Sequence, residues 1–98
     1  MRLSPEEVSA IKAAVAHAFG PDAAVRLFGS RADEQRPGGD IDLHIEVAPG
    51  VDVWKAKSRF DDHLFARIEE QRVDVVVRRR NDPARGIDLI AIRDGILL

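Results

Sequence analysis

The alternation of helix-type and strand-type hydrophobic patterns along this chain predicts an α+β domain, with one mixed β-sheet flanked by helices. In some segments apolar residues recur at helical spacing, and in the segments between them at every second position. Elements that alternate in this way pack as a sheet covered by helices. The 98 residues suffice for one domain, residues 1–98, and not for two.

The composition excludes several classes of protein. A net charge of −2, with 33% charged residues, is ordinary for a globular chain and argues against a dedicated nucleic-acid binder. No cysteine is present, which rules out disulfides and thiolate metal sites and fits a reducing cytosol. No apolar run approaches the ~18 residues that span a bilayer, and the N-terminus lacks a signal-peptide pattern. We therefore expect a cytoplasmic protein without a membrane partner.

The first helix has a complete start signal. Ser4 is a typical N-cap, Pro5 suits the first helical position, and Glu7 completes a capping box. Apolar residues follow at helical spacing until Gly20-Pro21, which ends the helix. Residues 23–28 then alternate as a first strand.

A polar loop and a regular strand come next. The loop runs from Arg31 to Gly39 and contains Pro37-Gly38-Gly39, which favours a turn. Between residues 40 and 47 polar and apolar side chains alternate strictly, as in a half-buried strand. The polar set is Asp40, Asp42, His44 and Glu46, and the apolar set is Ile41, Leu43, Ile45 and Val47.

The second half of the chain continues the alternation. Asp52 is expected to cap a helix that runs to about Gln71. Residues 72–77 then form a short strand, in which Asp74 is the only acid. In a central apolar strand a carboxylate is costly unless it is paired or bound to metal, so Asp74 favours a functional role.

The end of the chain predicts one more helix and one more strand. Asn81-Asp82-Pro83 is expected to open a short helix, with Ile87, Ile90 and Ala91 as its apolar positions. Residues 96–98 follow as a final strand or a docking tail.

Asp40 and Asp42 predict a metal site. Two residues apart on a strand, they share a face at a backbone separation of roughly 6.6 Å. Two like charges so close repel and raise each other's pKa unless a cation such as Mg²⁺ lies between them.

Gly29-Ser30 follows the first strand, where the chain must turn. Glycine allows close approach to a ligand, and the serine hydroxyl and turn N–H groups can donate to a phosphate. Arg31 and Arg36 are candidates to clamp a triphosphate, although loop arginines are more often simply solvated.

These motifs together resemble the nucleotidyltransferase superfamily that includes polymerase β. The pattern is Gly29-Ser30, a loop, Asp40-Ile41-Asp42-Leu43, and about thirty residues later Val73-Asp74-Val75-Val76-Val77. Over nearly its whole length the chain resembles the minimal nucleotidyltransferases, small bacterial proteins often encoded beside a HEPN-domain partner. One departure is Asp33-Glu34, where the family pattern has Arg-Gly.

The resemblance implies a fold, a substrate and residue roles. The fold is that of the polymerase β-like nucleotidyltransferases, and the substrate is ATP. Gly29 and Ser30 would hold the β- and γ-phosphates, with Arg31 as a further phosphate contact. Asp40 and Asp42 would bind two Mg²⁺ ions, and Asp74 would complete the first metal site and help to deprotonate the acceptor hydroxyl.

Three functions remain open at this point. The resemblance implies an antitoxin that adenylylates a HEPN-type RNase toxin, because a chain of this length leaves no room for an acceptor domain of its own. A second possibility is a binding module that neutralises the same partner sterically, with the acids idle. The third is a stand-alone small-molecule nucleotidyltransferase, in which a homodimer supplies the acceptor pocket.

Overall fold

The computed structural model describes residues 1–35 and 39–98, so Arg36, Pro37 and Gly38 lie outside the described residues. The described residues form, in order, α1 (Pro5–Phe19), β1 (Ala24–Phe28), the 3₁₀-helix η1 (Gly29–Ala32), β2 (Ile41–Val47), α2 (Val53–Phe65), β3 (Val73–Arg79), α3 (Gly86–Asp94) and β4 (Ile96–Leu97). The strands make one sheet in the order β3-β2-β1-β4. Strands β2 and β3 are parallel and the other neighbours antiparallel, which confirms the predicted α+β domain with a mixed sheet.

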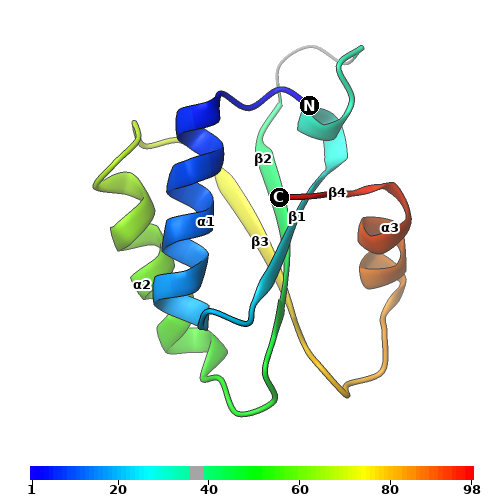
Figure 1. Cartoon of the computed structure of the whole chain (residues 1–98). Coiled ribbons are helices and arrows are strands. Elements are labelled where there is room, and N and C mark those ends of the chain that lie inside the picture. The colour runs from blue at the N-terminus through cyan, green and yellow to red at the C-terminus, as the bar shows by residue number, and fades with distance from the viewer. Residues whose placement is uncertain (36–38) are drawn as a thin grey trace.

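The helices are divided between the two faces of the sheet. Helices α1 and α2 lie side by side on one face, and α3 lies on the other (Figure 1). The apolar set of β2 points towards α1 and α2 and is completely buried, at Ile41, Leu43, Ile45 and Val47. The polar set of the same strand therefore faces α3. This division places Asp42 and its register partner Asp74 on the face where α3 lies.

The N-terminal helix follows the prediction. The Ser4 hydroxyl accepts from the Glu7 backbone N–H at 3.1 Å, and the Glu7 carboxylate accepts from the Ser4 N–H at 3.0 Å. The helix ends at Phe19, before Gly20 with φ of 107°. Local capping alone was enough to fix both ends of α1.

The second helix is shorter than predicted. It ends at Phe65 and not near Gln71. The N–H groups of Arg67 and Ile68 both donate to the Leu64 carbonyl, so the last turn tightens and the helical ladder stops. Ile68 still packs against the core from the following turn, which explains why its spacing resembled a continued helix.

The expectation that Asp74 lies in a central strand is wrong. Strand β3 is at an edge of the sheet, and the Asp74 side chain is 48% exposed. Edge strands reach water on one side, so a carboxylate costs less there than in the middle of a sheet. The cost of burying Asp74 is therefore smaller than its sequence context suggested.

The last helix begins later than predicted, and two of its isoleucines are exposed. Asn81 has a φ of 81° and the Asp82 N–H donates to the Arg79 carbonyl, so this segment is a turn that leaves β3. Helix α3 starts at Gly86, and Ile87 and Ile90 are exposed where a buried position was expected. Only Asp88 and Ala91 of α3 are buried.

The C-terminal residues form the predicted final strand. Residues 96–97 are strand β4, which is antiparallel to β1, and the Leu98 N–H donates a further hydrogen bond to the Val25 carbonyl.

Within the described part of the chain, no helix has both the length and the apolar character needed to cross a membrane.

Candidate active site

The structure brings Asp40, Asp42 and Asp74 together at one end of the sheet. Asp42 and Asp74 are register partners on the parallel strands β2 and β3, which places their backbones about 4.8 Å apart. Asp40 lies just before β2. The pKa of the Asp42 carboxyl is raised by its burial, and further by the charges of Asp74 and Asp40. The three acids therefore create a concentration of negative charge around Asp42.

Arg72 partly balances this charge. Its Nε lies 3.4 Å from Asp40 Oδ2 and 3.4 Å from Asp74 Oδ1. All three side chains are substantially exposed, so these ion pairs contribute little to stability. Within residues 1–35 and 39–98, the acids do not form a preassembled metal cluster.

The donor chemistry nevertheless fits a magnesium ion. Mg²⁺ binds carboxylate oxygens, usually one or two from the protein, and completes its shell with waters and substrate phosphates. Asp42 is repelled by both of its acidic neighbours, and Arg72 offsets this only in part, so a divalent cation would relieve the repulsion that is left. Asp40, Asp42 and Asp74 are the residues of this site that would hold it.

Gly29 is tightly coupled to Asp42. Strand β1 ends at Phe28, which pairs with Asp42 across the sheet, and Gly29 then turns with φ of 72°. A Cβ atom added to Gly29 would overlap Oδ2 of the Asp42 carboxylate. Glycine is thus required here by its backbone angle and by the close approach of a candidate ligand residue.

Gly29→Ala should therefore destabilise the protein by about 1–3 kcal/mol, the usual cost of a non-glycine residue in the left-handed region. The new methyl group should also displace the Asp42 carboxylate and reduce nucleotidyl transfer. Urea unfolding measures the first effect. Gly50→Ala is the matched control, because Gly50 has no positive φ and a Cβ there meets nothing within 4 Å. Equal stability of the two variants would contradict this assignment.

Ser30 and Arg31 lie in η1, directly after Gly29. The Ser30 hydroxyl packs so closely on Gly39 that a Cβ at Gly39 would collide with it. Arg31 donates from Nε to the Gly39 carbonyl at 3.1 Å and from Nη1 to the Arg2 carbonyl at 2.9 Å. Arg31 thus ties both the loop end and the N-terminal segment to η1. A contact between Arg31 and a phosphate stays a prediction. The hydrogen bonds of Arg31 show a structural role, which is to hold Gly39 and Arg2 beside η1.

A family profile described as "Nucleotidyltransferase domain" matches residues 8–91 of the chain. The chain belongs to this family. The match spans Gly29-Ser30 and all three acids, together with every strand except β4. A comparison with curated proteins finds no match. Members of the nucleotidyltransferase family generally use a nucleoside triphosphate and Mg²⁺, in agreement with the carboxylate donor set described above.

Sequence reasoning missed a buried polar cluster in this nucleotidyltransferase domain. His44, two positions after Asp42, is completely buried, and its Nε2 lies 2.8 Å from Asp88 Oδ1 of α3. Asp88 is equally buried and accepts from the Arg85 backbone N–H at 2.7 Å and from Arg85 Nε at 3.0 Å. The Arg85 side chain also reaches the Val77 carbonyl at 3.1 Å. An acid between the apolar positions of a short helix was the signal that could have revealed it.

This His44–Asp88–Arg85 cluster fastens α3 to the polar face of the sheet. The Arg85 guanidinium, and then the hydrogen bond from His44, hold the pKa of the Asp88 carboxyl well below its usual range despite its burial. Because Ala91 is the only other buried residue of α3, the cluster is the main contact that positions this helix. It determines where α3 stands relative to the three acids.

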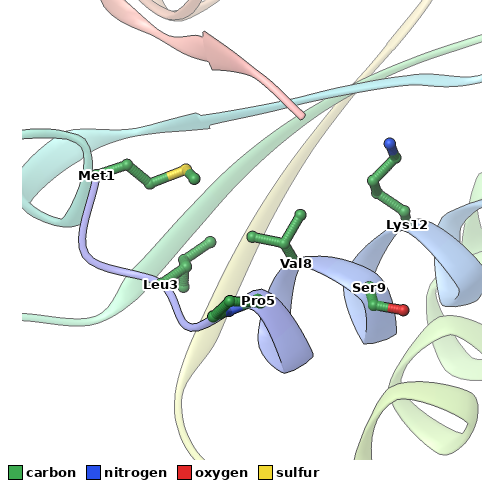
Figure 2. A pocket seen from close by; sticks show the side chains of 6 residues that line it. All are labelled: Met1, Leu3, Pro5, Val8, Ser9 and Lys12. Carbon is green, nitrogen blue, oxygen red and sulfur yellow. The ribbon is translucent and has the colours of Figure 1, made fainter.

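A cavity of about 410 Å³ lies between α3 and η1, within the size range of ligand sites. Its lining residues are Phe28, Gly29, Ala32, Asp33, Ile90 and Asp94. Gly29 connects this cavity to Asp42. A larger cavity of about 470 Å³ is lined by Met1, Leu3, Pro5, Val8, Ser9 and Lys12 at the start of α1 (Figure 2). Neither cavity is lined by Asp40, Asp42 or Asp74, but Gly29, which packs on the Asp42 carboxylate, lines the first. We therefore call the first the candidate nucleotide cavity.

Proposed function

We propose that this nucleotidyltransferase domain transfers AMP from ATP to a hydroxyl group of a HEPN-domain toxin and thereby acts as its antitoxin. The observation that carries the proposal is the pairing of Asp42 with Asp74 on neighbouring strands, with Gly29 packed against the Asp42 carboxylate. Acids and an open glycine turn are thus adjacent, as transfer of a phosphate-bearing group requires. The partner and its role as a toxin rest on the resemblance to minimal nucleotidyltransferases.

The proposed reaction is an in-line displacement at the α-phosphate. The acceptor oxygen forms a bond to the α-phosphorus, the bond from that phosphorus to the bridging oxygen breaks, and pyrophosphate leaves. Asp74 would take the proton of the acceptor hydroxyl, and the half-exposed position of its side chain at the sheet edge supports this role. Bound Mg²⁺ would stabilise the charge on the entering and leaving oxygens. Gly29 leaves the turn N–H groups open to the phosphates.

A second candidate is favoured by Arg72. This arginine bridges Asp40 and Asp74, which is the arrangement expected if the acids serve only as an ion-pair network. The domain would then neutralise its partner by binding alone. A stand-alone small-molecule nucleotidyltransferase, completed by a second copy, is a third candidate and has no such observation in its favour.

Intact-protein mass spectrometry of a co-expressed HEPN-domain protein tests the proposal. Co-expression with wild type should add about 329 Da for each AMP, together with roughly one negative charge. A partner that is bound and inactive but unchanged in mass would favour neutralisation by binding. A HEPN-domain protein that neither binds nor changes in mass would refute both antitoxin functions.

ATP and Mg²⁺ together should stabilise the protein more than either does alone, because the phosphates supply ligands that the acids lack. The gain should follow mass action, about 2.7 kcal/mol at a hundredfold excess over the Kd. Asp42→Asn should lose the metal-dependent part of this stabilisation. Thermal unfolding with ATP, with Mg²⁺ and with both measures these effects. An unchanged response of Asp42→Asn would place the metal elsewhere.

A further inference from the structure

Helix α3 exposes an unusual amount of apolar surface. Four of its nine residues are large, exposed aliphatic side chains, which we call the α3 apolar surface: Ile87 at 37%, Leu89 at 59%, Ile90 at 47% and Ile92 at 40% exposure. The only buried residues of the helix are Asp88 and Ala91. An acid is therefore buried while four large aliphatic side chains of the same helix face water, which is unusual for a surface helix.

This arrangement follows from the His44–Asp88–Arg85 cluster. Because Asp88 occupies the inner side of α3 and bonds to His44, the neighbouring isoleucines and Leu89 cannot turn towards the sheet. A helix that is apolar on most sides normally lies inside a protein. Exposed aliphatic side chains that gather in one patch mark a binding surface, whereas isolated ones are common.

The α3 apolar surface adjoins the candidate active site. Ile90, one of its four members, lines the cavity of about 410 Å³ together with Gly29. Gly29 in turn packs on the Asp42 carboxylate. Helix α3 also lies on the same side of the sheet as the polar set of β2 (Figure 1). A molecule that covers Ile90 therefore also lies beside the candidate nucleotide cavity.

The charges on α3 indicate what kind of molecule covers the α3 apolar surface. Arg93 projects from the same helix, but both of its contacts with Asp94 are 2.8 Å long, so the two charges cancel. An uncharged aliphatic patch has no means to hold a polyanion, which needs unpaired lysines or arginines. It suits a protein interface, in which the Arg93–Asp94 pair lies beside Leu89 and Ile90, one turn further along the helix.

The size of the helix argues against a dimer of this chain through α3 alone. Nine residues of helix extend about 13.5 Å. A stable interface needs about 800 Å² on each partner, which is more than one helix of this length offers. The same limit holds for any partner, so the molecule that covers α3 must reach past it, and Ile90 shares the candidate nucleotide cavity with Gly29.

We propose that the α3 apolar surface is where the acceptor protein docks. An apolar face of the acceptor covers Leu89, Ile90 and Ile92, and this contact places the acceptor hydroxyl over the cavity beside Asp42 and Asp74. The inference rests on the proposed function, since it assumes that the acceptor is a protein. It makes α3 the element that selects which protein is modified.

The test compares wild type with Leu89→Glu and with the matched control Trp54→Glu. Trp54 is also an exposed apolar residue, at 87%, but it lies on α2 on the opposite face of the sheet. Leu89 does not line the candidate nucleotide cavity. Each protein is assayed for binding of the HEPN-domain protein by titration calorimetry, for adduct formation by intact mass, and for stabilisation by ATP with Mg²⁺.

Leu89→Glu should weaken binding of the HEPN-domain protein and slow its modification by at least about tenfold, as expected for a buried charge in an interface centre. Its stabilisation by ATP with Mg²⁺ should match that of wild type, and Trp54→Glu should match wild type in all three assays. Binding of Leu89→Glu as tight as that of wild type would overturn the inference, as would equal losses in both variants.

Two further outcomes separate the inference from the proposed function. If wild type binds the HEPN-domain protein without modifying it, the proposed transfer fails, and a selective loss of binding in Leu89→Glu still supports docking on α3. If sedimentation shows that wild type is a dimer and Leu89→Glu a monomer, the α3 apolar surface belongs to a second copy of the chain, and the inference is overturned.

Discussion

Replacing Asp40 and Asp42 together by asparagine should lower nucleotidyl transfer by at least about a thousandfold, or roughly 4 kcal/mol in activation free energy. Asparagine keeps the shape of each side chain and removes the charge that would hold Mg²⁺. The fold should survive because Asp40 precedes β2 and is exposed, while Asp42 is only partly buried. Loss of the repulsion around Asp42 should even favour the folded state slightly.

The control for this double variant is Asp61→Asn/Asp62→Asn, which removes two exposed acids from α2. It should retain full activity. Partner mass, partner binding and protection of cells from the toxin are measured in parallel for both variants. Protection and adduct should disappear together in Asp40→Asn/Asp42→Asn, while binding persists. Full protection by this variant without any adduct would show that the domain acts by binding and that its acids are idle.

The largest loss of stability should come from Asp88→Ala. The change leaves His44 buried without its partner and removes the acceptor for Arg85. Removing one member of a buried polar pair typically costs about 3–5 kcal/mol. Helix α3 should detach first, because Ala91 alone would then anchor it inside the protein. Urea unfolding gives the total loss, and hydrogen exchange shows whether the amides of α3 lose protection before the core.

His44→Leu/Asp88→Leu is the informative comparison. Replacing both partners by apolar groups avoids the unpaired buried atom, so this variant should be more stable than Asp88→Ala. If both variants lose the same stability, the contribution of the His44–Asp88 pair is packing and not hydrogen bonding. If Asp88→Ala were as stable as wild type, the cluster would not be what holds α3 in place.

The Asp88 carboxyl also predicts a dependence of stability on pH. Its pKa is lowered in the folded protein, chiefly by Arg85 and then by the hydrogen bond from His44. A lowered folded-state pKa gives stability that is complete above the unfolded value, about 3.9, and is lost as the pH falls below it. Acid unfolding curves should therefore be steeper for wild type than for Asp88→Asn. Identical curves would contradict the assigned charge state.

Much of the fold was predictable because its determinants are local. The capping box at Ser4 and Glu7 fixed the start of α1, and Gly20 fixed its end. Strict alternation between residues 40 and 47 identified β2 and its buried face. Predictions failed where packing competes with local preference. The end of α2 depends on the bonds of Arg67 and Ile68 to Leu64, and Asn81 turns the chain where a helix start was expected.

The candidate site divides in the same way. The sequence by itself indicated the candidate residues, because Asp40 and Asp42 share one face of a single strand and the Gly29-Ser30 turn precedes them by one loop. Tertiary structure alone decided that Asp74 lies at a sheet edge beside Asp42, and that Gly29 packs on the Asp42 carboxylate. It also decided that Asp88 is buried against His44, 44 positions earlier in the chain, so that large aliphatic side chains of α3 face water. Pairing between distant strands, and burial of one polar cluster, are outcomes of global packing that no local pattern encodes.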